Sequence, residues 1–216
     1  ENDRFNIELS NSRNLDSNFV CIASGGYPRA SLFDWLVQTG HSLEEPVPSL
    51  FTFNLSHHPL TKLMGVSVEK SRVKITGIKI EQEGPLLITH WGLSGPAVLK
   101  LSAWGARQLA EVNWQFSITI NWLADQNEQT IKEKFSALRT GSAAQKITSK
   151  NCFGLPGRLW ELLTLGSGVK EEMRWADLPA AIQNKLVKNI CAYECSIKGK
   201  TTFKEEFVTA GGIKLS

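Results

Sequence analysis

Hydrophobic and polar residues alternate at the start of the chain, which is typical of β-strands. Residues 4–9 (RFNIEL) alternate in this way, and residues 18–24 (NFVCIAS) form a nearly continuous apolar run, as in strands covered on both faces. We therefore expect two strands here, joined by the polar loop 11–17. A short amphipathic helix is expected over 31–40, and prolines favour an extended segment over 41–55.

From residue 63 to residue 122 the pattern has mostly a period of two. One helix interrupts it at 97–110, with Pro96 at a first-turn position. The strands expected around this helix are 66–68, 73–80, 86–89 and 115–122. Short strands in this succession predict a β-rich, barrel-like unit.

Residues 125–193 carry a helical pattern instead. The helices expected there are 127–138, 141–148, 156–164 and 178–193. The chain then returns to strand over 195–215. The simplest organisation is an α+β fold in which a helical subdomain interrupts a β-rich, barrel-like domain. The boundaries expected are 1–40 for an N-terminal part, 41–124 for the β-rich domain, 125–194 for the helical subdomain and 195–216 for the returning strands.

Composition is that of an ordinary globular protein. Of 216 residues, 42% are hydrophobic and 21% charged, and the formal net charge of +3 comes from interspersed acids and bases. Without a basic block we expect no nucleic acid partner, and no apolar stretch reaches the roughly 20 residues that span a membrane. The cysteines form no CxxC pair, which favours reduced thiols and a cytoplasmic location. They are Cys21, Cys152, Cys191 and Cys195.

Both ends of the chain resemble the interior of a longer protein. The chain does not begin with Met, and residues 4–9 and 207–215 already alternate like strands within a sheet. We expect the natural protein to extend beyond both ends, and mass spectrometry of that protein checks this expectation.

The most informative stretch is 89–97, which reads THWGLSGPA. An apolar strand precedes it and a helix follows. Backbone N–H groups at a helix N-terminus suit an anion or a cofactor, but glycine is also needed where a turn is tight for steric reasons alone. The sequence leaves both interpretations open. Ser94 is no hydrolase nucleophile, because the second glycine of the GxSxG motif falls one place early and no histidine follows His90.

Other cofactor motifs are missing from the sequence. It contains neither the GxGxxG dinucleotide motif nor a P-loop. The histidines, at positions 41, 57, 58 and 90, show no metal-ligand spacing with one another or with carboxylates, so no metal site is expected.

Several motifs resemble one family and occur in that family's order. Residues 23–28 (ASGGYP), 40–50 (GHSLEEPVPSL), 89–97 and 208–213 (VTAGGI) are similar to its ATGGxSxP, GHxI with PxL, THxGLSGPA and VTxGGV patterns. The chain thus resembles the YhiN/BaiN-type bacterial flavoproteins, which are NAD(P)- and FAD-dependent oxidoreductases. It departs from them in lacking GxGxxG and in having residues 29–33 where a Gly-rich stretch normally follows the proline.

The resemblance implies a Rossmann-type FAD domain split in sequence, with a β-rich domain inserted into it and a helical one inserted into that. Residues 1–40 and the end of 195–216 would be remnants of the FAD domain. It places Gly25, Gly26, Thr209, Gly211 and Gly212 near the flavin. Residues 90–96 would brace the β-rich domain or border the substrate cavity, with His90, Trp91 and Ser94 as the substrate-side candidates. No catalytic acid or base is assigned, because nothing in the sequence requires one, and the flavin would carry the hydride chemistry.

The leading interpretation is the substrate-side or cap portion of an FAD-dependent oxidoreductase that transfers hydride to an unknown small molecule. From this chain alone we expect no catalysis and weak or absent FAD binding. The alternative is a non-catalytic binding or interaction module derived from the same family. A third interpretation, an RNA-modifying flavoprotein of related architecture, conflicts with the lack of a basic patch.

Overall fold

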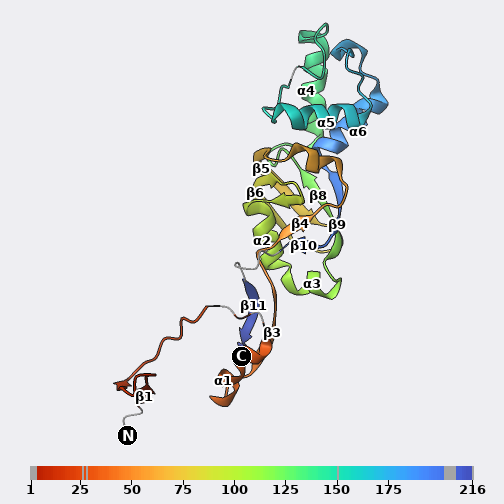
Figure 1. Ribbon diagram of the computed structural model, residues 1–216. Helices are drawn as coiled ribbons and strands as arrows, with labels where there is room; N and C mark the ends of the chain where they lie inside the picture. Colours follow the sequence, from red (N-terminus) through yellow and green to blue (C-terminus); the bar gives the residue numbers. More distant parts are fainter. Residues whose placement is uncertain (1–3, 26, 28, 150, 202–207, 216) are drawn as a thin grey trace.

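A closed antiparallel sheet forms the centre of the molecule. The computed structural model describes residues 4–25, 27, 29–149, 151–201 and 208–215 (Figure 1). Seven strands pair in the order β10-β4-β7-β6-β5-β8-β9. Their bounds are β4 (Thr52–Asn54), β5 (Ser67–Ile75), β6 (Glu81–Ile88), β7 (Gly92–Ser94), β8 (Gln115–Asn121), β9 (Tyr193–Lys198) and β10 (Lys200–Thr201).

The two edges of this sheet belong to one stretch of chain. Only Gly199 separates β9 from β10, and its carbonyl oxygen accepts a hydrogen bond of 3.0 Å from the Asn54 N–H. Since β9 pairs with β8 and β10 pairs with β4, the sheet closes into a barrel and leaves no free edge between them.

Side chains at alternate positions along the barrel strands are buried and fill the interior, as the period-two pattern predicts. Val73 and Ile75 on β5 are fully buried, as are Ile118 and Ile120 on β8. The expected helix 97–110 is divided at Gly105 into α2 (Pro96–Trp104) and α3 (Ala106–Glu111), and α2 packs against β4, β5, β6 and β7.

A buried serine on α2 ties the helix to the segment that enters the barrel. The Ser102 hydroxyl accepts a hydrogen bond of 2.9 Å from the Phe51 N–H and donates one of 2.8 Å to the Leu99 carbonyl. We expect Ser102→Ala to lower the free energy of unfolding by about 1–3 kcal/mol, because the Phe51 N–H loses this acceptor in a buried position. Urea unfolding measures the change. The matched control is Ser136→Ala on an exposed helix face, where an equal loss would contradict the prediction.

The helical subdomain lies at one end of the barrel (Figure 1). It consists of α4 (Glu128–Gly141), α5 (Gly157–Ser167), η3 (Trp175–Asp177) and α6 (Ala180–Cys191). A capping box begins α4: Asn127 Oδ1 accepts from the Thr130 N–H at 2.9 Å, and Thr130 Oγ1 accepts from the Asn127 N–H at 3.0 Å. The 3-10 helix η2 (Pro59–Leu63) lies between this subdomain and the barrel and contacts α5. One continuous hydrophobic cluster runs from the barrel into these helices.

Two antiparallel ribbons lie outside the barrel. The first pairs β1 (Phe5–Glu8) with β2 (Asn14–Ser17), and the second pairs β3 (Leu43–Pro48) with β11 (Thr209–Ile213). Figure 1 shows the β3–β11 ribbon extending from the barrel end opposite the helical subdomain, with η1 (Ala30–Phe33) and α1 (Asp34–Gln38) beside its far end. The β1–β2 ribbon lies beyond it, at the end of an extended segment.

The prediction of a buried strand at 18–24 is wrong. These residues form no strand, and the Phe19 side chain is 88% exposed. The partner of β1 is instead β2, which falls within the expected loop 11–17. An apolar run becomes a central strand only where other elements cover it, and no described element covers this one.

Two further predictions fail. No helix forms over 141–148, because α4 ends at Gly141 and Lys146 instead makes an isolated bridge with Arg174. The strand expected over 73–80 ends at Ile75, where a turn with Gly77 at φ 84° follows. The α+β class and the remaining helices are confirmed, while the domain boundaries stay predictions.

Candidate functional site

The stretch 89–97 forms a hairpin and a corner rather than an open anion cradle. Thr89 Oγ1 accepts a hydrogen bond of 3.1 Å from the Gly92 N–H, and the chain then continues as β7 between β4 and β6. Gly95 caps α2 with φ 94°, and Pro96 occupies the first helical position. The path of the chain is therefore fixed by strand pairing on both sides.

Both glycines of this corner lie against backbone. A Cβ on Gly92 would lie 2.0 Å from the Phe53 carbonyl oxygen, and one on Gly95 would lie 2.7 Å from that of Pro85. No side chain fits at either place. The geometry supports the steric interpretation of these glycines.

The substrate-side candidates are spread along this corner. His90 is exposed, and its ring lies edge-on to that of Trp91 with 4.0 Å between ring centroids. Trp91 is half-buried, and its carbonyl oxygen accepts a hydrogen bond of 2.8 Å from the Leu55 N–H. Ser94, also half-buried, lies at the opposite end of β7.

Three of the five residues placed near the flavin by resemblance lie together on β11. Thr209 and Gly212 pair with β3, and Gly211 lies at the register shift between Ala210 and Gly212. Gly211 has φ 136°, and a Cβ there would lie 2.8 Å from the Glu45 carbonyl oxygen. The ribbon thus needs glycine at this position for its own geometry.

Aromatic packing connects this ribbon to the segment after Gly25. A Cβ on Gly212 would meet the Phe33 ring at 3.9 Å, and the Phe33 and Tyr27 rings pack edge-on with 4.8 Å between centroids. We call Tyr27, η1, α1 and the β3–β11 ribbon with its flanking residues Val208, Lys214 and Leu215 the terminal corner. Gly25 itself is exposed with open space where a Cβ would be, and Gly26 lies outside the described residues.

One ion pair links the terminal corner to α3, and a second lies within the corner. Glu44 on β3 pairs with Arg107 on α3 at 3.8 Å and with Lys214 at 3.7 Å. The corner also exposes apolar side chains that a folded protein ordinarily covers. They are Leu32, Trp35, Val37, Val208, Ile213 and Leu215.

The structure does not bring the two groups of candidates to one place. The terminal corner lies before the start of β4, where β3 leads into it, whereas the turn with His90 and Trp91 lies beyond the end of β4, next to Leu55. Ser94 is nearer the terminal corner, because β7 runs antiparallel to β4. The roles of all these residues therefore stay predictions.

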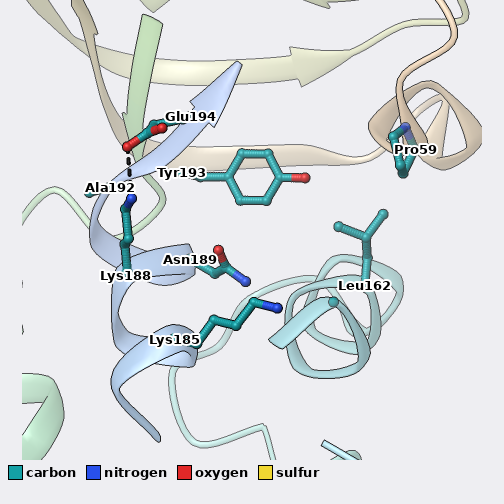
Figure 2. Close-up of a pocket in the computed structure, with 9 residues that line it drawn as sticks. Pro59, Leu162, Lys185, Lys188, Asn189, Ala192, Tyr193 and Glu194 are labelled. Carbon is teal, nitrogen blue, oxygen red and sulfur yellow. Dashed lines mark ion pairs between the residues drawn. The ribbon is translucent and has the colours of Figure 1, made fainter. Parts of the chain in front are cut away.

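A pocket of about 500 Å³ lies between the barrel and the helical subdomain. Figure 2 shows Lys185 and Asn189 of α6 and Tyr193 of β9 pointing toward α5 and η2 across it. Its remaining lining comes from Pro59, Leu162, Gly166, Lys188, Ala192 and Glu194. The sequence predictions missed this pocket, because polar residues at helical spacing on α6 are equally typical of a helix face turned to water.

The titratable groups in and near this pocket show no sign of activation for acid–base or nucleophilic chemistry. Burial raises the pKa of Tyr193 to about 12, so its hydroxyl stays protonated at neutral pH. Burial likewise raises the pKa of Cys195 to about 12 and that of Cys191 to about 11, which keeps both thiols unreactive. His58 Nδ1 accepts a hydrogen bond of 3.2 Å from the Leu60 N–H, and burial lowers the pKa of this histidine.

The described part of the chain holds no metal-binding cluster and no membrane-spanning helix. Within it, no three His, Cys, Asp or Glu side chains gather so as to hold a metal ion. None of its helices has the length and apolar character to cross a bilayer.

The fold and the terminal corner define a closed β-barrel domain with an inserted helical subdomain. Residues 47–208 match the family model described as HI0933-like protein barrel and H2TH domain. The chain therefore belongs to the HI0933-like family, that of the YhiN/BaiN flavoproteins, and the barrel expected from the sequence is confirmed.

Two curated relatives extend this assignment. The chain is 26% identical to a ribosomal RNA dihydrouridine synthase of Haemophilus influenzae, with 97% of this chain and 51% of the relative covered. It is 22% identical to a 3-dehydro-bile acid delta(4,6)-reductase of Clostridium scindens, with 90% and 49% covered. The chain spans about half the length of these relatives and is a domain of a flavoprotein oxidoreductase family.

Proposed function

We propose that this chain is the substrate-side domain of an FAD-dependent reductase whose flavin is held mainly by another part of the protein. The observation that carries the proposal is the match of a barrel domain to only half of two reducing enzymes. The terminal corner fits this role, because its exposed apolar side chains suit a covering domain.

The terminal corner also fits the edge of a flavin site. Gly25 is exposed at φ 79° with open space around the missing Cβ, so a ligand can approach its backbone closely. Gly212 and Thr209 lie on the adjoining ribbon. When bound there, FAD would supply the hydride chemistry, and these residues would position it and exclude water.

The proposed reaction is the reduction of a carbon–carbon double bond. Dihydrouridine differs from uridine by two hydrogens on such a bond, and the name delta(4,6)-reductase also describes double-bond reduction. A hydride goes to one carbon and a proton to its neighbour, which together make up the two hydrogens. NAD(P)H is the proposed source of the hydride that reduces the flavin.

We propose a small molecule rather than nucleic acid as the substrate. Three lysines of the helical subdomain are paired with carboxylates, in the pairs Lys132–Glu128, Lys146–Glu172 and Lys188–Glu194. Each such pair reduces the positive charge available to a phosphate backbone, which favours a small substrate.

Flavin retention tests the proposal. The protein, purified in the form its gene encodes, is expected to show the visible absorbance of oxidised flavin, and NAD(P)H without oxygen should bleach it. The 216-residue chain alone should be colourless. A colourless complete protein would overturn the proposal in favour of a non-catalytic binding module.

A variant pair locates the flavin within the complete protein. Gly25→Val places a branched side chain where the ligand approaches, so we expect flavin content to fall about tenfold or more. The control Gly154→Val meets the same conditions, a positive φ of 69° and open space, but lies between α4 and α5. Equal flavin loss in both variants, or none in Gly25→Val, would contradict the assigned role of Gly25.

A further inference from the structure

The pocket between α5, α6, β9 and η2 carries donor groups that the fold does not use. No ion pair or side-chain hydrogen bond occupies Lys185 Nζ or the Tyr193 hydroxyl within the described part of the chain. Asn189 Nδ2 donates to Ser167 Oγ at 2.8 Å, which holds the amide in place beside them. These groups point into a shared space in Figure 2.

We propose that this pocket binds the oxyanion of a small, partly apolar molecule, with Lys185 Nζ supplying the charge and the Tyr193 hydroxyl a second hydrogen bond. An ammonium and a phenol O–H both donate, and a charge-assisted hydrogen bond is stronger than a neutral one. Lys185 is exposed at the mouth of the pocket, whereas Tyr193 is half-buried. Pro59, Leu162 and Ala192 form the apolar part of the lining. Carboxylates and phosphate monoesters share the required chemistry.

The charges favour a single small anion over a nucleic acid strand. Lys188, the second lysine of the lining, is held by Glu194 at 2.9 Å, so Lys185 provides the one ammonium of the lining without a carboxylate partner. An extended polyanion needs several unpaired cations along a surface.

The Tyr193 hydroxyl is suited to this role over a wide pH range. It is half-buried, and its ring packs edge-on against Trp122 with 5.9 Å between centroids and against His58 with 6.0 Å. These contacts fix the ring, and burial keeps the hydroxyl protonated by raising its pKa. A fixed donor loses little conformational entropy when a ligand binds.

This pocket is separate from the proposed flavin edge. It lies where the barrel meets the helical subdomain, whereas the terminal corner lies at the opposite end of the barrel (Figure 1). Its occupancy can therefore be measured without reference to flavin or to reduction.

The test uses phenyl phosphate and benzoate as probes, with benzyl alcohol as the uncharged comparison. They are titrated into the protein as its gene encodes it, and binding is followed by NMR shifts of the Asn189 side-chain amide and neighbouring backbone amides. We expect at least one anionic probe to shift these signals and benzyl alcohol not to. Whichever of the two binds more tightly identifies the oxyanion as phosphate or carboxylate.

Variants assign the donors. Lys185→Gln keeps much of the aliphatic stem and should weaken the anionic probe about tenfold, and Tyr193→Phe should weaken it roughly three- to tenfold. The control Lys170→Gln removes an exposed charge from the turn after α5 and should leave affinity unchanged. Lack of binding by both anions, or equal weakening by the Lys170 control, would overturn the proposal. So would tight binding of single-stranded RNA that weakens equally in both lysine variants.

Discussion

Replacing Gly92 by alanine is expected to destabilise the barrel by about 4 kcal/mol. The new Cβ would lie 2.0 Å from the Phe53 carbonyl oxygen and 2.8 Å from the Leu55 nitrogen, atoms of the neighbouring strand β4 and its continuation. Backbone cannot move away there without breaking the β4–β7 pairing, in which Asn54 lies opposite Gly92. The backbone angle of 157° adds strain for any side chain.

Thermal and urea unfolding measure this loss. The matched control is Gly157→Ala, the same chemical change at the start of α5, where a Cβ meets nothing within 4 Å and the backbone needs no positive φ. There alanine should be neutral or slightly stabilising, because it has the higher helix propensity. A Gly92→Ala protein as stable as this control would contradict the close approach of β4 and β7.

The sequence predicted the barrel strands best where hydrophobic and polar residues alternate in step with buried and exposed positions. On β8 and β5 the buried isoleucines and valines match the period-two pattern, and the helices α4, α5 and α6 follow theirs. The strand prediction failed at 18–24. An apolar run indicates that its side chains need other elements to bury them, but it does not show whether such elements are present. The helix prediction failed at 141–148, where the chain follows tertiary contacts such as the bridge from Lys146 to Arg174.

The candidate site was less predictable because its parts are distant in sequence. The glycines at 92 and 95 could be recognised as special, but only the approach of Phe53 and Pro85 distinguishes a steric need from a ligand cradle. Likewise, the sequence near Lys185 does not indicate that Tyr193, Leu162 and Pro59 complete a pocket around it. Motifs indicate which residues matter, and long-range packing decides what they contact.

Alanine at Gly211 is expected to open the β3–β11 ribbon while leaving the barrel folded. Its Cβ would lie 2.8 Å from both the Glu45 carbonyl oxygen and the Pro46 Cα, and the residue would have to hold φ at 136°. Ribbon pairing must then yield, at a cost of about 3 kcal/mol or more. The barrel does not depend on this pairing, because β3 and β11 form a sheet of their own.

Hydrogen exchange separates local opening from global unfolding. The Ser49 N–H donates to the Val208 carbonyl at 2.9 Å and the Lys214 N–H donates to that of Ser42 at 2.8 Å, so both amides should lose protection in Gly211→Ala. The control Gly40→Ala has a positive φ of 94° but open space for a Cβ, so it shares the backbone strain without the clash. Retained protection of both amides in Gly211→Ala would contradict the geometry of the ribbon. If the terminal corner positions FAD, the complete protein with Gly211→Ala should also lose flavin, whereas Gly40→Ala should keep it.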